Sequence, residues 1–399
     1  MRILKVTETY FPFLEKGGPP VKVRALARGL ARRGHHVTVL TADFGIAGRG
    51  ISGLERSAFG WQLEEDGVEA LYLPSLLRYR ALTWNPKAAS FCRRRLSAFD
   101  VVHVFGLYDL LGPAVSAGCR RRGIPYVLEP MGMFRPIVRS LRLKRMFHAG
   151  PGRAMTRGAR RVIATASQEA DELVAGGIPR EKIVVRRNGV ESPGKCSEAG
   201  TFRRQWGIPA EEKLILFLGR VVQKKSPELL LEAFARWRVS AVNGAEARVV
   251  FAGPFERDGV RARLEALERK HGLQGRTTYT GALYGDAKWA AYRDADVFVL
   301  PSQNENFGNS AAEAVACGTP VIVTENCGIA PHVNGRAGLV VPHDAEAIAA
   351  ALARILGDAA IHARLVSGCP EVTASLGWEE PVAQMESLYQ TLVARHRRE

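Results

Sequence analysis

The sequence predicts a two-domain α/β protein in which each domain is a doubly wound, Rossmann-like parallel sheet with helices on both faces. The chain has 399 residues, more than one hydrophobic core usually supports, and 46% of them are apolar. Short β-branched runs alternate with amphipathic helical stretches, which is typical of parallel sheets. A polar segment with Pro and Gly at 191–200 interrupts this alternation, which then starts again.

An amphipathic stretch at Val21–Arg33 predicts a helix between the first two strands. The predicted strands of the first half are Ile3–Thr7, Val37–Thr41, Val101–Phe105, Tyr126–Leu128 and Val162–Thr165. Those of the second half are Leu214–Leu218, Arg248–Phe251, Thr277–Thr280, Val297–Leu300 and Val321–Val323. We therefore expect an N-terminal domain at 1–190, a linker at 191–200 and a C-terminal domain at 201–377. We expect 378–399 to form an amphipathic helix that crosses back to the N-terminal domain.

The sequence shows neither an apolar run of about 18 residues nor the basic and apolar pattern of a secretory leader. We expect a cytoplasmic protein without a membrane span. The cysteines are far apart and form no Cys-x-x-Cys pair, so we expect neither a disulfide framework nor a metal site. They are Cys92, Cys119, Cys196, Cys317, Cys327 and Cys369.

The net charge of +16 is concentrated in one part of the chain. Between Arg120 and Arg161 there are twelve basic residues and one acidic residue, Glu129. The twelve are Arg120, Arg121, Arg122, Arg135, Arg139, Arg142, Lys144, Arg145, Arg153, Arg157, Arg160 and Arg161. Such a field attracts partners rich in phosphate. A nucleic acid is not the expected partner, because no aromatic residues are interleaved with the basic ones and no base-reading motif occurs.

The most informative motif extends from Pro301 to Val323. A predicted strand ends in a loop with Glu305 and Gly308, and a helix is expected to start near Asn309 or Ser310, either of which could cap it. Backbone N–H groups at such a helix start suit a pyrophosphate. Glu313 follows Glu305 by eight residues, so both carboxylates can flank one ligand, with Glu313 facing a ribose.

These residues resemble the large family of retaining glycosyltransferases of the group 1 (family 4) type. The hallmark of that family is present here as Glu305, Glu313, Ala314, Gly318, Pro320 and Val321. Further matches are Asn188-Gly189-Val190, Gly219-Arg220, Lys225, Tyr279, Gly281, Tyr292, Ala295-Asp296 and Pro301-Ser302. The matches are dense in the C-terminal half and scattered in the N-terminal half.

The resemblance implies a GT-B architecture, with the two Rossmann-like domains facing each other across a cleft that holds the site. It implies retaining transfer from a UDP- or GDP-sugar to an acceptor hydroxyl. In this family the positions of Arg220 and Lys225 serve the leaving diphosphate instead of a metal ion, so we expect no metal or cofactor. Glu305 should hold the sugar hydroxyls and Glu313 the ribose. Ser226 departs from the family pattern, in which Gly is usual, and this departure concerns the shape of the loop.

The same resemblance implies further contacts to the donor. They come from Gly18, Gly281, Leu283, Phe307, Gly308 and Asn309. Gly18 lies in a Gly-Gly-Pro-Pro loop whose backbone could approach the reacting groups closely, although a plain structural turn is the alternative. His103 and Gly132 are candidates for sugar or acceptor contacts. For His103, a buried core histidine is as good an interpretation.

The segment Val138–His148 alternates apolar with basic residues and predicts a helix that can lie on an anionic membrane or receive a lipid-linked acceptor. A solvated helix face is the alternative. We therefore expect a role in polysaccharide or glycolipid assembly at the inner membrane face. The rival hypothesis for the whole chain is a catalytically silent scaffold that binds a sugar nucleotide. A GT-B epimerase or phosphorylase is a further alternative that no residue specifically indicates.

Overall fold

The computed structural model describes residues 1–14, 17–79, 82–134, 145–191, 198–240, 246–256 and 258–398. The chain forms two compact units. Unit 1 comprises Met1–Gly189 together with Trp378–Glu399, and unit 2 comprises Val190–Gly377.

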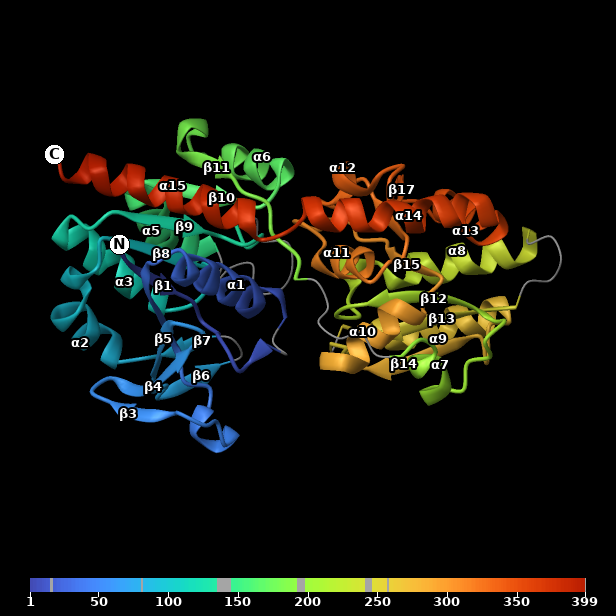
Figure 1. Ribbon diagram of the computed structural model, residues 1–399, viewed down its shortest axis with the longest axis horizontal. Helices are drawn as coiled ribbons and strands as arrows, with labels where there is room; N and C mark the ends of the chain where they lie inside the picture. Colours follow the sequence, from blue (N-terminus) through green and yellow to red (C-terminus); the bar gives the residue numbers. More distant parts are fainter. Residues whose placement is uncertain are drawn as a thin grey trace. The chain divides into compact units, whose positions relative to one another are not determined.

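Unit 1 contains a nine-stranded sheet in the order β11-β10-β9-β8-β1-β2-β5-β4-β3 (Figure 1). Its strands are β1 (Arg2–Val6), β2 (His36–Ala42), β3 (Glu55–Ser57), β4 (Gly60–Glu65), β5 (Val68–Leu73), β8 (Val101–Phe105), β9 (Tyr126–Glu129), β10 (Arg161–Ala164) and β11 (Ile183–Val185). All neighbouring pairs are parallel except β3–β4 and β4–β5. A separate antiparallel pair joins β6 (Leu77–Tyr79) to β7 (Leu82–Trp84).

Helices cover both faces of this sheet. The helices are α1 (Gly18–Arg32), α2 (Lys87–Arg94), α3 (Leu111–Arg122), α5 (Arg153–Gly158), α6 (Ser167–Ala175) and α15 (Glu379–His396). Short turns of other helix types are η2 (Ile46–Arg49), η3 (Leu96–Ala98), η4 (His148–Gly152) and η5 (Arg180–Lys182). Buried side chains of α1 and α15 pack on one face, and those of α2, α3, α5 and α6 pack on the other.

The C-terminal helix α15 belongs to unit 1 although it follows unit 2 in the chain (Figure 1). Val382, Met385, Tyr389 and Leu392 recur at helical spacing and are buried against the sheet. Gly29 of α1 allows the close approach of Val382, because a Cβ at position 29 would lie 2.5 Å from its Cγ2 atom. These contacts place α15 on the same face of the sheet as α1.

Unit 2 contains a six-stranded parallel sheet in the order β14-β13-β12-β15-β16-β17 (Figure 1). Its strands are β12 (Lys213–Leu218), β13 (Ala247–Ala252), β14 (Thr277–Gly281), β15 (Val297–Leu300), β16 (Val321–Thr324) and β17 (Gly338–Val341). Its helices are α7 (Thr201–Gln205), α8 (Pro227–Ser240), α9 (Val260–His271), α10 (Gly285–Asp294), α11 (Asn309–Ala316), α12 (Ala330–Val333), α13 (Ala345–Gly357) and α14 (Ala359–Ser375), with a 3-10 turn η6 (Gln223–Lys225). Two apolar clusters, one on each face, form its core.

The prediction of two Rossmann-like α/β domains is confirmed, and each predicted strand agrees with an observed one to within a residue or two at each end. The segment 192–197, inside the predicted linker, lies outside the described residues. Among the helices that the structure describes, none is long and apolar enough to cross a membrane.

Candidate active site

The strand order of unit 2 reverses between β12 and β15, so these two strands flank the switch point of the sheet. In open α/β sheets, ligands bind outside the carboxyl ends of the strands at that point. The loop after β12 carries Arg220 and Lys225, and the loop after β15 carries Glu305. The residues predicted from sequence therefore come from the two loops that the topology favours.

Lys225 and Glu305 lie together across this point. The distance from Lys225 Nζ to Glu305 Oε2 is 3.2 Å, and the two side chains are 17% and 23% exposed. Gly219 makes room for the lysine, because a Cβ there would lie 3.2 Å from Lys225 Nζ. Because the pair is partly exposed, Lys225 or Glu305 can bind a ligand group in place of the other at a modest cost in free energy.

Ser226 has the left-handed backbone conformation, with a φ of 47°. This explains why glycine suits the position, since a side chain makes that conformation costly. The serine keeps the loop shape, and its hydroxyl is hydrogen-bonded to His343 Nε2 at 2.9 Å. The departure from the family pattern therefore leaves the turn after η6 intact.

The loop that holds Glu305 is fixed by backbone hydrogen bonds to the segment after β16. The Glu305 N–H donates to the Asn326 carbonyl at 3.0 Å, and the Gly328 N–H donates to the Glu305 carbonyl at 2.9 Å. These bonds hold the backbone at Glu305 while its carboxylate remains partly exposed.

The start of α11 differs from the prediction in its cap. Gly308, with a φ of 97°, is the N-cap residue, and neither Asn309 nor Ser310 caps the helix with its side chain. A left-handed N-cap requires glycine, and a Cβ here would lie 3.1 Å from Ile329 Cγ2. The Phe307 side chain is buried in the core of unit 2, so this residue can offer a ligand only its backbone.

Polar atoms near this helix start are buried without a hydrogen-bond partner among the described residues. They are Ser302 Oγ, Asn306 Nδ2 and Ser310 Oγ. Buried polar groups are seldom left unpaired in folded proteins, and ligand sites are among the exceptions. Their position beside Glu305 fits a site that hydrogen-bonds a polar ligand.

Glu313 is held by two residues of α10. Lys288 Nζ lies 2.9 Å from Glu313 Oε1, and the Tyr292 hydroxyl donates to Glu313 Oε2 at 3.0 Å. Burial, and then the negative charge of Glu313, raise the pKa of Tyr292 well above its usual value, so the phenol remains a donor. The sequence motif includes Tyr292 but did not indicate that it binds Glu313, and Lys288 was not predicted at all. The two residues lie four positions apart on one helix face.

The remaining donor candidates of unit 2 differ in their surroundings. The Arg220 side chain is exposed and its Nη1 atom lies 2.8 Å from Glu256 Oε1, so it needs to leave this pair to reach a diphosphate. Gly281 ends β14 with a φ of 71°, and no atom lies within 4 Å of a Cβ built there. Leu283 packs partly against the core.

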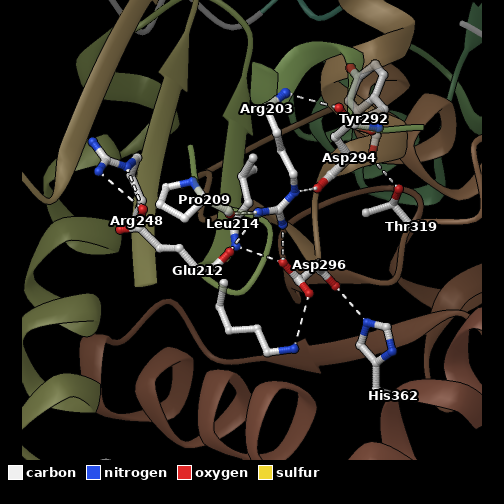
Figure 2. A network of polar contacts seen from close by, with 12 residues as sticks. Arg203, Pro209, Glu212, Leu214, Arg248, Tyr292, Asp294, Asp296, Thr319 and His362 are labelled. Carbon is white, nitrogen blue, oxygen red and sulfur yellow. Dashed lines mark hydrogen bonds and ion pairs between the residues drawn. The ribbon is translucent and has the colours of Figure 1, made fainter. Parts of the chain in front are cut away.

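Asp296, one of the residues of the resemblance, and the nearby Asp294 have a structural role in a polar network, part of which Figure 2 shows. Asp294 accepts hydrogen bonds from the backbone N–H groups of Gly200 at 2.7 Å and Phe202 at 2.8 Å, at the start of α7. Asp296 accepts from Arg203 Nη2 at 2.7 Å and from the Leu214 N–H at 2.8 Å (Figure 2). This network ties α7 to β12, so its aspartates stabilise the fold.

In unit 1, His103 is a core residue. Its side chain is fully buried in β8, and its Nδ1 atom is hydrogen-bonded to the Tyr389 hydroxyl of α15 at 2.6 Å. Its Nε2 atom lies 3.5 Å from Glu129 Oε2. Burial lowers its pKa to about 3, so the ring is neutral. Of the two interpretations that the sequence left open, the structure favours the buried core histidine.

The backbone at Gly132 is also engaged within the protein. Its N–H donates to Glu169 Oε1 at 2.6 Å, and Glu169 Oε2 accepts from the Thr165 N–H at 2.8 Å. Met131 and Gly132 both have positive φ values, of 56° and 72°, and the buried Glu169 holds this turn. The Gly132 N–H is thus paired within the protein, and the expected ligand contact from the backbone at Gly132 stays a prediction.

The Gly-rich loop of unit 1 ends where α1 begins. Gly17 is the N-cap of α1, with a φ of 107°, and Gly18 is the first helical residue. No atom lies within 4 Å of a Cβ built at Gly17, so the loop is uncrowded on that side. Residues 15–16 and the segment 135–144 lie outside the described residues, and with them most of the predicted basic helix, including Arg139, Arg142 and Lys144.

Sequence reasoning missed a buried ionic cluster in unit 1, formed by Lys5, Lys22, Glu129 and Arg186. Glu129 Oε1 accepts from Lys22 Nζ at 2.8 Å, and both of its oxygens accept from Arg186 Nη2 at 2.7 Å. Burial alone would raise the pKa of Glu129, but Arg186 and Lys22 outweigh it and hold that pKa well below its usual value. The available signal was a lysine inside the apolar strand β1.

Comparisons with known proteins agree with this geometry. The family model for Glycosyl transferases group 1 matches residues 199–368, and the model for the Glycosyl transferase 4-like domain matches residues 17–189. The chain is 30% identical to a D-inositol 3-phosphate glycosyltransferase of Xylanimonas cellulosilytica, over 94% of this chain and 92% of that protein. It is 32% identical to a 2-deoxystreptamine N-acetyl-D-glucosaminyltransferase of Streptomyces fradiae, over 90% of this chain and 88% of that protein.

Solved structures share the fold over nearly the whole chain. Sucrose-phosphate synthase from Thermosynechococcus elongatus has a TM-score of 0.72 and 23% identity, with 99% of each chain covered. HepE from Anabaena has a TM-score of 0.77 and 16% identity, with 98% of this chain and 100% of that chain covered. The chain is therefore a glycosyltransferase with the GT-B fold. It belongs to the group 1 glycosyltransferases, as the Glu305–Glu313 motif predicts.

Proposed function

We propose that this enzyme transfers a sugar from a UDP- or GDP-sugar to an acceptor hydroxyl with retention of anomeric configuration. In this proposal Glu313 binds the donor ribose and Glu305 binds hydroxyls of the transferred sugar. Lys225, Arg220 and the N–H groups at the start of α11 receive the diphosphate. HepE, which shares the fold, was solved with UDP and with UDP-glucose, and this supports a nucleotide donor.

One observation carries the proposal: lysine–carboxylate pairs lie on both sides of the start of α11. They are Lys225–Glu305 at 3.2 Å and Lys288–Glu313 at 2.9 Å, and all four side chains are partly exposed. A carboxylate has about four lone-pair sites. Lys288 and Tyr292 occupy two of those of Glu313, and the remaining sites can accept both hydroxyls of a ribose.

The leaving group is the nucleoside diphosphate, whose negative charge increases as the bond from the anomeric carbon to its oxygen breaks. The loop after β12 carries Arg220, Lys224 and Lys225, and we assign Arg220 and Lys225 to the diphosphate. Groups that bind this growing charge more strongly than the ground state accelerate the step. We propose that the acceptor oxygen attacks the same face that the diphosphate leaves, and that its proton passes to the departing phosphate oxygen.

Nucleotide release from a panel of UDP-, GDP- and ADP-sugars tests the donor. Wild-type protein should hydrolyse or transfer one sugar nucleotide faster than the others. Lys225→Met should lose most of this rate, because the diphosphate loses a cation, while the exposed Lys270→Met on α9 serves as a matched control. Absence of nucleotide release with every donor would favour the silent scaffold over a donor-using enzyme.

The proposed mechanism needs no metal ion, because two cations of the chain serve the diphosphate. Among the residues that the structure describes, no cluster of three or more His, Cys, Asp or Glu could hold one. Activity should therefore persist in EDTA. Loss of turnover in EDTA that Mg²⁺ or Mn²⁺ restores would overturn this part of the proposal.

For the acceptor, we propose a phosphorylated or otherwise anionic molecule at the cytoplasmic membrane surface. The basic stretch from Arg120 to Arg161 supports this, since a neutral acceptor would not require it. Relatives named D-inositol 3-phosphate glycosyltransferase carry a phosphate in the name of their substrate.

Reversing Arg139, Arg142, Lys144 and Arg145 to Glu should release the protein from anionic vesicles, at about 1 kcal/mol for each residue. A wild-type protein that ignores such vesicles at low salt would favour a free acceptor.

A further inference from the structure

Unit 1 has a basic pocket at one end of α6, outside the site described above. Its volume is about 520 Å³, within the usual range for small-molecule sites of roughly 300–1,000 Å³. His148, Arg153, Arg157 and Lys182 line it, together with Phe134, and no Asp or Glu is among the described residues that line it. We call it the α5 pocket, after the helix that supplies both arginines.

Among the residues that the structure describes, no carboxylate pairs with Arg153, Arg157 or Lys182 of the α5 pocket. Lys182 Nζ donates to the Arg157 carbonyl at 2.9 Å, which ties η5 to α5 without cancelling its charge. Like charges gathered in a concave wall attract an anion.

The surrounding elements position His148 and bring the two arginines to one face of α5. The helix that leads into α5 contains a π turn at His148–Gly152, and such turns are frequent at functional sites. Arg153 and Arg157 lie four residues apart, so they share one helix face. The His148 ring is hydrogen-bonded to the Tyr108 hydroxyl at 2.7 Å and packs edge-on against Phe134, with 5.3 Å between ring centroids.

We propose that the α5 pocket binds a phosphate group of the acceptor. Two guanidinium groups and a lysine match the several anionic oxygens of a phosphate or diphosphate, because arginine binds such groups with paired N–H donors. The assignment of this phosphate to the acceptor rests on the proposed function. The phosphate belongs either to a free phosphorylated molecule or to a membrane lipid, and both present the same chemistry to the pocket.

Calorimetric titration with inorganic pyrophosphate tests the α5 pocket in the full-length protein, with saturating UDP present to occupy the donor site. Wild type should bind pyrophosphate, and R153Q/R157Q should bind it about tenfold to a hundredfold more weakly, because charge-assisted hydrogen bonds are lost. The control is R93Q/R94Q, which removes two exposed arginines of α2 in the same unit. Melting temperatures establish that each variant is folded.

Sedimentation with phosphatidylcholine vesicles containing phosphatidylglycerol separates the two sources of phosphate. A lipid source predicts that wild type sediments, that pyrophosphate competes, and that R153Q/R157Q stays in solution. A free source predicts pyrophosphate binding without a difference between wild type and R153Q/R157Q in sedimentation. Equal pyrophosphate affinity in wild type and R153Q/R157Q, or an equal loss in R93Q/R94Q, overturns the assignment.

The donor reaction is measured separately on the same proteins. R153Q/R157Q should keep wild-type nucleotide release in the absence of acceptor, since both arginines belong to unit 1 and the proposed donor residues Lys225, Glu305 and Glu313 belong to unit 2. If no protein releases nucleotide, the donor proposal fails, and the pyrophosphate titration still decides the α5 pocket.

Discussion

The ion pairs at the switch point of unit 2 are partly exposed, whereas those of Glu129 in unit 1 are buried. Lys225 and Glu305 are 17% and 23% exposed, but Lys22 and Glu129 are 6% and 0% exposed. If a buried carboxylate gave up its ion-pair partner, both charges would stay in the core without a counter-ion, which is costly. A partly exposed carboxylate can replace its lysine partner with a ligand group. Solvent exposure thus separates carboxylates that can serve the donor from a carboxylate that holds the fold.

The largest expected effect is on the buried side of this comparison. Glu129→Gln should lower the free energy of unfolding by about 3–5 kcal/mol, because Arg186 and Lys22 would remain buried without their counter-ion. Urea denaturation measures this loss. The matched change Glu313→Gln should cost less than about 1 kcal/mol, since its lysine is partly exposed. Equal losses in the two variants would remove the distinction between the regions.

Lys5, beside this cluster, should make the stability depend on pH. Burial, and then Arg186, lower its pKa from 10.5 to about 7, so the unfolded chain binds this proton more tightly than the folded one. The destabilisation caused by this lowered pKa has its full value below about pH 7 and disappears as the pH rises to 10.5. Lys5→Met should therefore be more stable than wild type by about 4 kcal/mol at pH 7, and the difference should shrink steadily up to pH 10.5.

A pH-independent difference between Lys5→Met and wild type would mean that the variant acts by packing alone. Comparing the two proteins at each pH cancels the titration of other lysines. Lys5 Nζ has no hydrogen-bond partner among the described residues and lies 5.2 Å from the centre of the Phe105 ring, so methionine suits its surroundings.

The smallest expected effect concerns Lys288, which positions Glu313. Lys288→Met should weaken donor binding by about 1 kcal/mol and raise KM with little change in kcat, because Glu313 loses one of its two anchors. Lys213→Met is the control, since that lysine pairs with Asp296 in the structural network at 3.4 Å. If both variants bind donor as wild type does, Lys288 has no positioning role.

The fold was predictable because the β-branched strands and the helices between them leave strong periodic signals in the sequence. The core of the motif was predictable for a different reason, since Glu305 and Glu313 have a fixed spacing around a strand end and a helix start. The glycine cap was missed because Asn309 and Ser310 are good caps by residue type. Gly308 is necessary because its φ of 97° disfavours a side chain and because Ile329 approaches from elsewhere in the chain.

Contacts that the sequence could not reveal are prominent in unit 1, where partners come from distant parts of the chain. His103 meets Tyr389, which lies 286 residues away, and Glu129 meets Lys22, which lies 107 residues away. No local pattern carries such contacts. Sequence alone therefore left His103 open between a ligand and a core role, and the packing of α15 on the sheet favours the core role.

The most direct test of the central claim is the affinity of the enzyme for its nucleotide, measured by calorimetry on wild type and Glu313→Ala in EDTA. We expect the variant to lose about 1–3 kcal/mol of binding free energy, because the ribose hydroxyls lose their acceptor, while its unfolding transition stays near that of wild type. A variant that binds the nucleotide as tightly as wild type would contradict the account and remove Glu313 from the donor site.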